Sequence, residues 1–339
     1  MILIIFLILT NFVTTSIMNI SIVGGSGFIG TELLKNLEEF ECLNIDKKNS
    51  DSYSKITVIG DVRDKEFLSK NLKSSQIVVL LAAEHRDDVN PSSLYYDVNV
   101  QGTQNVLDAM TKNNIKKIIF TSSVAVYGEN EGKPVESFPL NPLNHYGKSK
   151  MEAEKKIGNW QKEDPNNRSV TIIRPTVIFG EKNRGNIYNL FNQINSGKFI
   201  MIGDGKNKKS IAYVKNIVAF IKDRIKNSTH GYSIYNYTDG PDFQVKELVD
   251  ITNKTLKITP YITSNIPYWL GMLGGFSFDM LTKLTQKSMP ISSIRVQKFC
   301  AKTQFDSSEA KKIFSAPYNL KEAVINTLTS EFLSPNSDN

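Results

Sequence analysis

Two patterns of apolar residues take turns along this chain, short continuous runs and longer stretches of helical periodicity. Short runs rich in Ile, Val and Leu are separated by stretches whose apolar residues recur at helical spacing, as Leu33, Leu34 and Leu37 do. Runs of this kind are typical of strands that are buried on both faces of a parallel sheet. We predict strands at 19–23, 41–45, 57–59, 76–81, 118–120, 171–173 and 232–237, and helices at 64–71, from 144, and at 211–225. The pattern therefore predicts an α/β fold with a doubly wound parallel sheet.

The first apolar run leads directly into the glycine-containing sequence GGSGFIG and then into a helical pattern. Gly24 permits a tight turn, Gly27 lets the backbone approach a pyrophosphate, and Gly30 lets helix and strand pack closely. The N-terminus of the helix would face the phosphates with its partial positive charge, and we expect Phe28 and Ile29 there to contact the cofactor. This is the Gly-x-x-Gly-x-x-Gly form of the Rossmann dinucleotide-binding fingerprint.

The second and third predicted strands each lead to an aspartate. Asp46 stands where a carboxylate accepts hydrogen bonds from the adenosine ribose and repels a 2′-phosphate, which favours NAD over NADP. Lys47 and Lys48 keep NADP open, because cations there could bind that phosphate, although solvated loop charges are the simpler interpretation. Asp61 could contact the adenine amino group, cap the helix at 64–71, or do both.

A second polar cluster follows the strand at 118–120. Ser123 closes that run, so its hydroxyl would lie at the carboxyl edge of the sheet, where open α/β sheets bind ligands. Asn144 is a candidate helix N-cap, which would place Tyr146 and Lys150, four residues apart, on one helix face. The ammonium would favour the phenolate, so that a tyrosine with an ordinary pKa near ~10 becomes usable as a base near neutral pH. These three side chains can deprotonate an alcohol while a hydride leaves its carbon, although Tyr-x-x-x-Lys alone also occurs by chance.

An unusually polar loop follows the fourth predicted strand. His85 and Arg86 lie there, at the carboxyl edge of the predicted sheet. We expect them to contact substrate, with an ordinary surface loop as the alternative.

Composition narrows the class of protein. With 339 residues, 40% of them hydrophobic and 22% charged, the chain is an ordinary globular sequence long enough for two domains. The net charge of +7 suits an anionic substrate or an anionic membrane surface, or is neutral background. No block of basic residues interleaved with aromatics indicates nucleic acid. Cys42 and Cys300 lie far apart without metal-ligand spacing and predict buried thiols in a reducing compartment rather than a disulfide. The presence of three histidines argues against a metal site built from several histidines.

Two segments are more apolar than the rest. Residues 1–17 carry no charge, lack the features of a secretory signal and are short for a spanning helix. They are either an extension ahead of a start at Met18 or a hydrophobic anchor. Residues 266–281 contain aromatic and Met side chains, with Lys283 and Lys287 at their edge. They predict either a helix at a lipid interface or a core helix.

The motifs occur in an order that resembles the extended short-chain dehydrogenase/reductase superfamily over roughly 19–240. The matching residues are Gly24, Gly27 and Gly30, Asp61-Val62-Arg63-Asp64, Asn99 with Thr103, Ser123 with Tyr127-Gly128, Tyr146 with Lys150, and Arg174-Pro175. The resemblance implies bound NAD and a catalytic set of Ser123, Tyr146 and Lys150, the last two also touching the cofactor. It further implies cofactor contacts from Val62, Leu81, Ala82, Ala83, Asn99, Ser122 and Pro175.

Within that superfamily the chain resembles sugar 4-epimerases. It resembles more specifically the bacterial epimerases that convert undecaprenyl-diphosphate N-acetylglucosamine to the N-acetylgalactosamine form. The sequences LAAEHRDDV (81–89), SLYYDVN (93–99), NHYGKSK (144–150), RPTVIFG (174–180) and LGMLGG (270–275) carry this likeness. It implies a lipid-linked substrate, a place at the cytoplasmic face of the bacterial inner membrane, peripheral or anchored, and a product used for surface polysaccharide such as O-antigen.

The reaction follows from the same resemblance. Sugar 4,6-dehydratases of the superfamily carry an Asp-Glu pair directly after the position of Ser123, whereas Val124 and Ala125 stand here and offer no acid or base. By resemblance, Tyr146 takes the proton of the sugar 4-hydroxyl while Ser123 hydrogen-bonds that oxygen. Lys150 lowers the pKa of the phenol and holds the nicotinamide ribose. The C4 hydride moves to NAD and returns to the other face of a 4-keto sugar. A nucleotide-sugar 4-epimerase and a non-catalytic NAD-binding scaffold or sensor stay open as alternatives.

The resemblance also divides the chain. Asn186 lies where nucleotide-sugar epimerases place an Asn that meets the diphosphate, and Lys209 lies where they use Arg. A lysine binds phosphate as a point charge, although a solvated basic hairpin is the alternative. We expect a dinucleotide-binding domain of 18–180 and 209–240, a smaller, mostly C-terminal α/β substrate-binding domain of 181–208 and 241–330, the apolar segment 1–17 and a polar tail at 331–339. Superfamily members often form homodimers, here through helices near 95–112 and 146–163.

Overall fold

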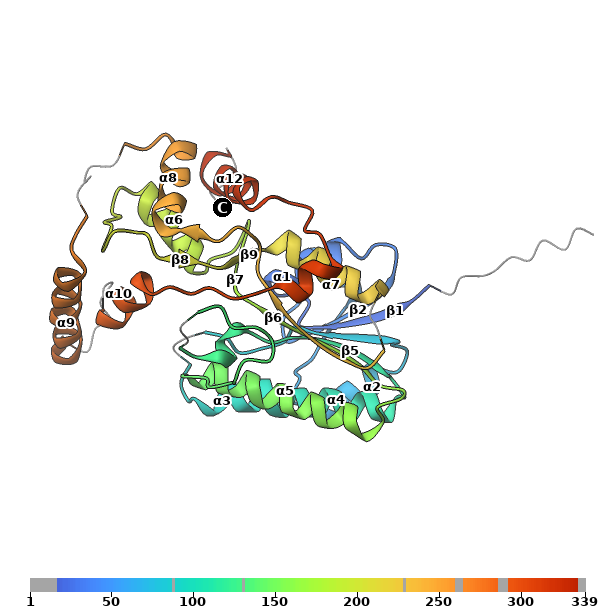
Figure 1. Cartoon of the computed structure of the whole chain (residues 1–339). Coiled ribbons are helices and arrows are strands. Elements are labelled where there is room, and N and C mark those ends of the chain that lie inside the picture. The colour runs from blue at the N-terminus through green and yellow to red at the C-terminus, as the bar shows by residue number, and fades with distance from the viewer. Residues whose placement is uncertain are drawn as a thin grey trace, which may run out of the picture.

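The computed structural model describes residues 17–86, 89–129, 132–227, 230–259, 265–285 and 292–334. Its centre is a sheet of seven parallel strands, counted within those ranges (Figure 1). The strands are β1 (Asn19–Val23), β2 (Glu41–Asp46), β3 (Thr57–Ile59), β4 (Ile77–Leu80), β5 (Lys117–Thr121), β6 (Ser169–Pro175) and β10 (Tyr232–Tyr237). Their spatial order is β10-β6-β5-β4-β1-β2-β3. The order reverses between β1 and β4, which makes the carboxyl ends of these two strands the expected place for a ligand.

Helices cover both faces of this sheet (Figure 1). One face is covered by α1 (Phe28–Lys35) and α7 (Val214–Asn227), and the other by α2 (Lys65–Asn71), α4 (Gly102–Lys112) and α5 (His145–Glu163). In β4, Ile77 and Val79 belong to the first hydrophobic core, whereas Val78 and Leu80 belong to the second. This two-sided burial explains why the strands form continuous apolar runs in the sequence. The predicted doubly wound α/β fold is confirmed.

A smaller group of elements from the second half of the chain gathers on one side of the sheet (Figure 1). It contains β7 (Val177–Phe179), α6 (Asn186–Asn195), β8 (Lys208–Lys209), β9 (Ile211–Tyr213), β11 (Phe243–Gln244), α8 (Val245–Leu256), α12 (Leu320–Leu328) and η4 (Thr329–Leu333), whereas α11 (Ser308–Ile313) packs on β10 of the large sheet. A small core of Ile194, Val245 and Val249 joins α6 to α8. The assignment of these segments to a separate substrate-binding domain, with the boundaries given above, stays a prediction.

The helices α9 (Tyr268–Thr285) and α10 (Ser293–Cys300) form a pair that projects from this group (Figure 1). Large apolar side chains along α9 are exposed, among them Trp269, Phe276 and Leu284. The interpretation of residues 266–281 as a core helix is therefore wrong. Within the described ranges, no helix has the length and apolar character that crossing a membrane requires.

Two local predictions are wrong. Residues 211–225 do not form one helix, because Ile211–Tyr213 pairs with β7 as the buried strand β9 before α7 begins. Asp61 does not cap the helix at 64–71, because its carboxylate is held by Arg63, and the cap is Asp64, which accepts from the Phe67 backbone N–H at 2.9 Å.

The two ends of the chain are described in part. Residues 331–333, which the sequence places in the polar tail, belong to η4, where the Glu331 carboxylate binds Arg184 at 2.7 Å. The ring of Phe332 stacks on that of Tyr188. Residues 335–339, and residues 1–16 of the predicted extension or anchor, lie outside the described residues.

Candidate functional site

The turn between β1 and α1 is confined by the segment that follows β4. Gly24 has a φ of +95°, and a Cβ there would lie 2.4 Å from the backbone nitrogen of Ala82. Leu81 and Ala82 both donate their backbone N–H to the carbonyl of Val23, at 2.8 Å, and Ala83 continues the same half-buried segment. Position 24 therefore needs glycine both for its conformation and for the close approach.

The two other glycines of the fingerprint differ in what surrounds them. A Cβ at Gly30 would lie 2.4 Å from the Cα of Gly25, so packing of the turn against α1 requires glycine there. At Gly27 the backbone is extended, and a Cβ would meet a single backbone carbonyl at 3.4 Å. The protein's own packing thus leaves space in front of Gly27 and of the α1 amino terminus at Phe28 and Ile29. A pyrophosphate approaching a helix amino terminus uses such a space.

Asp46 ends β2 beside this turn. Its Oδ2 accepts from the Ser26 backbone N–H at 3.0 Å, and its Oδ1 accepts from the Lys48 backbone N–H at 3.1 Å. These bonds orient a half-exposed carboxylate whose oxygens keep lone pairs for further donors. A ribose hydroxyl is such a donor.

Asp61 and Val62 follow β3. The Asp61 carboxylate forms a salt bridge with the Arg63 guanidinium at 2.7 Å, and the hydrogen bond from Arg63 lowers the pKa of Asp61. Val62 is buried against Gly102, where a Cβ would lie 2.6 Å from Val62 Cγ2. A role for both residues beside the adenine stays a prediction.

Two serines follow the carboxyl end of β5. Ser123 Oγ accepts from the Ala125 backbone N–H at 3.1 Å and caps the short helix η3 (Val124–Tyr127). Ser122 Oγ is buried and has no hydrogen-bond partner among the described residues. A buried hydroxyl without a partner costs about 1–3 kcal/mol. That cost fits a site that a polar ligand completes.

Helix α5 begins where the sequence predicts. The Asn144 side chain accepts from the Gly147 backbone N–H at 2.8 Å, as an N-cap does. Tyr146 is half-buried in the first turn, and Lys150 follows one turn later. The cap therefore fixes the start of the helix that carries both side chains.

Lys150 is almost completely buried, with 2% of its surface exposed. Its ammonium donates to the carbonyl of Thr121 at 2.8 Å and lies 4.6 Å from the centre of the Phe120 ring. Burial lowers the pKa of Lys150 to about 7, and the negative charge of Glu154 opposes that shift only in part. The charge of this side chain is thus poised near neutral pH, and the carbonyl that holds it was not anticipated from the sequence.

Asn99 links the loop after β4 to α5. It lies in a π-helical turn, η2 (Asp97–Gln101), that connects α3 (Ser93–Tyr96) to α4. Its side chain pairs with both backbone groups of Glu84, at 2.8 and 2.9 Å, and donates to Ser149 Oγ at 2.9 Å. Ser149 in turn donates to the carbonyl of Tyr146 at 2.8 Å. Contact of Asn99 with a cofactor stays a prediction, whereas its role in joining these segments was missed, because Ser149 gives no signal of it in the sequence.

A buried ion pair ties α5 to β6. The Arg174 guanidinium binds the Glu154 carboxylate through two hydrogen bonds, of 2.9 and 2.6 Å, and donates to the Tyr127 hydroxyl at 2.8 Å. Tyr127 donates to the Asn236 side chain at 2.7 Å. Pro175, a predicted cofactor contact, is the buried last residue of β6 beside this pair. Glu154 could have been found from its spacing, four residues after Lys150 on the same helix face, whereas Asn236 has no comparable signal.

The predicted substrate residues lie on separate elements. His85 is exposed, and the exposed Arg86 pairs with the buried carboxylate of Glu84 at 3.0 Å. Burial alone would raise the pKa of Glu84, but hydrogen bonds from Arg86 outweigh it and hold that pKa below its ordinary value. Asn186 is the exposed first residue of α6.

Lys209 is not a solvated hairpin lysine. Its ammonium donates to the carbonyls of Lys298 and Ala301, at 2.9 and 2.6 Å, at the carboxyl end of α10. Burial lowers its pKa to about 8. A phosphate at this position would meet a lysine that α10 already orients.

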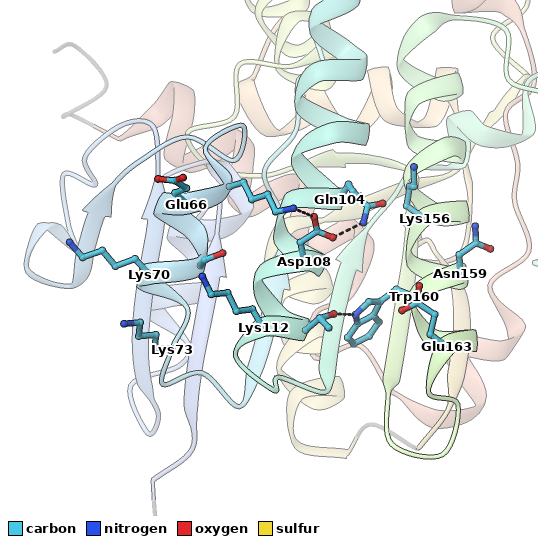
Figure 2. Close-up of a pocket in the computed structure, with 13 residues that line it drawn as sticks. Glu66, Lys70, Lys73, Gln104, Asp108, Lys112, Lys156, Asn159, Trp160 and Glu163 are labelled. Carbon is cyan, nitrogen blue, oxygen red and sulfur yellow. Dashed lines mark hydrogen bonds and ion pairs between the residues drawn. The ribbon is translucent and has the colours of Figure 1, made fainter.

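A groove of about 1070 Å³ lies at the other end of α5 (Figure 2). Figure 2 shows its walls, which come from α2, α4 and α5, with Asp108, Lys156 and Trp160 among them. The groove contains none of the predicted site residues, and its lining is strongly charged. Pairing of two chains through α4 and α5 stays a prediction.

Comparisons with known proteins agree with this geometry. The model of the NAD dependent epimerase/dehydratase family matches residues 20–236. The N-acetyl-α-D-glucosaminyl-diphospho-ditrans,octacis-undecaprenol 4-epimerase of Escherichia coli O157:H7 is 54% identical, over 94% of this chain and 97% of its own length.

Solved structures of low identity share the fold. A crystal structure of UDP-glucose 4-epimerase has a TM-score of 0.74 and 22% identity, and covers 95% of this chain and 99% of its own. UDP-glucuronic acid 4-epimerase from Bacillus cereus, in complex with NAD, has a TM-score of 0.73 and 18% identity, and covers 92% of this chain and 98% of its own. The cofactor predicted from the sequence, NAD, is that of the matched family. The chain belongs to the NAD dependent epimerase/dehydratase family.

Proposed function

We propose that the protein is a 4-epimerase that interconverts N-acetylglucosaminyl-diphospho-undecaprenol and its N-acetylgalactosaminyl form. The observation that carries this proposal is the 54% identity to an undecaprenol-linked epimerase. That identity extends over 94% of the chain, so it includes the half beyond the nucleotide fingerprint. The product would serve the synthesis of surface polysaccharide such as O-antigen.

Three features of the site fit NAD. They are the space in front of Gly27, the oriented carboxylate of Asp46, and the buried hydroxyl of Ser122 that lacks a partner among the described residues. When bound, NAD supplies an acceptor and then a donor for the hydride of the sugar C4. The residues that would hold it are those predicted from the sequence, from the Gly24 turn to Pro175.

The chain's own side chains would move the proton. Tyr146 takes it from the 4-hydroxyl, and Ser123, which follows the carboxyl end of β5, hydrogen-bonds the same oxygen. Lys150, one turn from Tyr146 and held by the Thr121 carbonyl, supplies the positive charge that favours the phenolate. Val124 and Ala125 in η3 offer no acid or base, which disfavours dehydration.

Epimerisation also constrains how substrate is held. Because hydride leaves one face of C4 and returns to the other, the hexose must turn over within the site, so the diphosphate has to anchor it. Asn186 at the start of α6 and Lys209 beneath α10 are the groups proposed for that role, with His85 and Arg86 nearer the sugar. We accordingly propose that residues 181–208 and 241–330 act as the substrate-binding domain. Because the proposed substrate carries a lipid, we also propose that the protein works at the cytoplasmic face of the inner membrane, in peripheral contact with it or anchored to it.

The test is purified protein with undecaprenyl-diphosphate N-acetylglucosamine in detergent micelles, followed by acid hydrolysis and chromatography of the sugar. N-acetylgalactosamine should appear, and Tyr146→Phe should slow its formation by about 10²–10⁴-fold, the usual contribution of a general base. Tyr232→Phe is the matched control, because it removes the hydroxyl of an exposed tyrosine on β10. Equal turnover of UDP-N-acetylglucosamine would instead make the protein a nucleotide-sugar epimerase. A Tyr146→Phe protein with full biological activity would make it a scaffold.

A further inference from the structure

The outer face of α9 is an uninterrupted apolar stripe. Its members follow helical spacing and are all exposed: Trp269 (67%), Leu273 (58%), Phe276 (58%), Met280 (66%) and Leu284 (71%). At 100° per residue they fall within an arc of about 80°. A helix of 18 residues is about 27 Å long, so the stripe runs along most of it. Soluble proteins rarely leave so much contiguous apolar surface in water without a use for it.

The opposite face of α9 is packed, which fixes the direction of the stripe. A Cβ at Gly271 would lie 2.6 Å from Ile202 Cγ2, and one at Gly275 would lie 2.7 Å from the Ser293 Cα of α10. Asp279, the one carboxylate of α9, accepts hydrogen bonds from the backbone N–H of Ser293, at 3.1 Å, and from its hydroxyl. The acid is therefore turned toward α10, away from the stripe.

The base of this helix pair is tied to the predicted diphosphate site. Asn207 donates to the carbonyls of Phe299 and Ala301, at 2.7 and 3.2 Å. Lys209 donates to the last carbonyls of the same helix, as described above. Side chains thus satisfy the carboxyl end of α10, and the stripe is held at a fixed position relative to Lys209.

The segment around the stripe is basic. Residues 265–305 contain one carboxylate, Asp279, and three described cations lie on α10 or directly after it, Arg295, Lys298 and Lys302. Arg295, Lys298 and Lys302 are exposed. Two copies of the chain meeting through this face would bring like charges together, whereas an anionic phospholipid surface would attract them.

We propose that α9 docks on the surface of an anionic phospholipid bilayer, with its stripe in the interfacial region and the helix parallel to the membrane. This inference rests on the proposed function and deepens it. An undecaprenyl chain stays in the membrane while its diphosphate sugar projects into water, so the active site has to be held at the lipid surface. Docking through α9 presents the base of α10, and with it Lys209, to that diphosphate. The charged rim and the three glycines of the helix suit an interfacial position.

The chain's two tryptophans provide a direct test. Trp160 is buried in the core, with 4% exposed, whereas Trp269 lies in the stripe. Vesicles of phosphatidylethanolamine and phosphatidylglycerol, about 3:1, carrying brominated acyl chains should quench the emission of the full chain and shift it to shorter wavelength. In Trp269→Phe the remaining emission should be unaffected by the vesicles. Absence of quenching in the unsubstituted protein overturns the proposal.

Vesicle flotation measures binding of the protein to the bilayer independently of fluorescence. The triple variant Leu273→Gln, Phe276→Gln and Met280→Gln should bind at least tenfold more weakly. The double variant Ile313→Gln and Leu333→Gln is the control, since it changes exposed apolar side chains outside α9 and should bind as the unsubstituted chain does. Equal binding by the triple variant refutes docking through the stripe. A dimer that forms without lipid and dissociates in the triple variant would also refute it, in favour of self-association.

Turnover separates this proposal from the proposed function. The triple variant should epimerise undecaprenyl-linked sugar in vesicles at least tenfold more slowly, yet match the unsubstituted protein on a water-soluble, short-prenyl diphosphate sugar. Equal losses on both substrates would place the stripe in folding or catalysis and overturn docking. If the unsubstituted chain epimerises neither substrate but is still quenched by brominated lipid, the proposed function fails and the docking surface stands.

Discussion

Replacing Lys150 with methionine should stabilise the protein while abolishing its turnover. The ammonium is buried and held by one carbonyl, that of Thr121, at 2.8 Å. Methionine fills a similar volume without a charge to desolvate. Removing a charge from the interior relieves a cost that the folded chain otherwise bears.

The size of that cost follows from the pKa of Lys150. Burial lowers it from 10.5 to about 7, a shift of roughly 3.5 units. At 1.36 kcal/mol per unit this corresponds to a penalty on the order of 5 kcal/mol at pH values below 7, where the folded protein must keep the charge. The lost charge-assisted hydrogen bond to Thr121 offsets about 1.5–3 kcal/mol of the gain. The variant should therefore be more stable by roughly 2–3 kcal/mol at pH 6.

The change with pH of the stability difference between the two proteins is a stricter test than its value at one pH. Between pH 7 and 10.5 the unfolded chain holds the lysine proton and the folded chain does not, so unfolding takes up a proton. The contribution of Lys150 to the free energy of unfolding is therefore lowest below pH 7, and it rises as the pH increases to 10.5. Relative to Lys150→Met it should rise by about 1.4 kcal/mol per pH unit, or roughly 4 kcal/mol from pH 7 to pH 10.

Chemical denaturation of both proteins, stripped of nucleotide, at pH values from 6 to 10 measures this difference. Other titrating groups are common to the two chains and cancel in the subtraction. A difference in stability that stays flat across this range would refute the assignment of a depressed pKa to Lys150. Retention of full turnover by Lys150→Met would refute its role beside Tyr146.

Substitutions at Glu154, in the glycine turn and at Asn144 test the framework of the site. Glu154→Gln leaves the buried Arg174 without its charged partner and should lower the free energy of unfolding by about 3–5 kcal/mol, measured by denaturant titration. A loss below about 1 kcal/mol would show that water reaches the ion pair. Gly27→Ala should weaken NAD binding at least tenfold, measured by equilibrium titration, and should leave the melting temperature of the nucleotide-free protein nearly unchanged. Gly30→Ala should lower that melting temperature, because a Cβ there meets the backbone of Gly25. Equal changes in melting temperature from the two variants would contradict the different surroundings of the two glycines. Asn144→Ala removes the cap of α5 and should cost about 1 kcal/mol of stability by thermal unfolding, while Asn144→Ser should restore most of it.

Strands and helix caps that depend on neighbouring residues could be predicted from the sequence. Elements that form only through contacts between residues far apart in the chain could not. The strand at 232–237 and the cap at Asn144 follow from local pattern, and the structure has both. The strand β9 could not be separated from the helix after it, because Ile211–Tyr213 becomes a strand only by pairing with β7. Asp61 could not be distinguished from Asp64 as a cap, because the choice depends on where the Arg63 guanidinium turns.

The candidate site shows the same division. Ser123, Tyr146 and Lys150 were identified from motif order, but the carbonyl that holds Lys150 was not, since Thr121 contributes only backbone. Lys209 was expected to face solvent or phosphate, yet it binds the end of a helix about 90 residues later in the chain, with Lys298 as one partner. Composition alone left residues 266–281 open between core and interface, and only the packing of α9 on α10 decided that the apolar side faces outward.

Helix α5 shows why stability and chemistry are coupled in this protein. Its cap at Asn144 fixes the register, and successive turns then place Tyr146, Lys150 and Glu154 on one face. The Glu154 carboxylate pairs with the buried Arg174 guanidinium. Its negative charge also raises the pKa of Lys150 and so opposes the loss of that proton. The ion pair thus secures the helix to β6 and helps keep the neighbouring lysine charged in an apolar setting. A change at Glu154 should therefore alter the pH profile of turnover as well as stability, which a merely structural ion pair would not do.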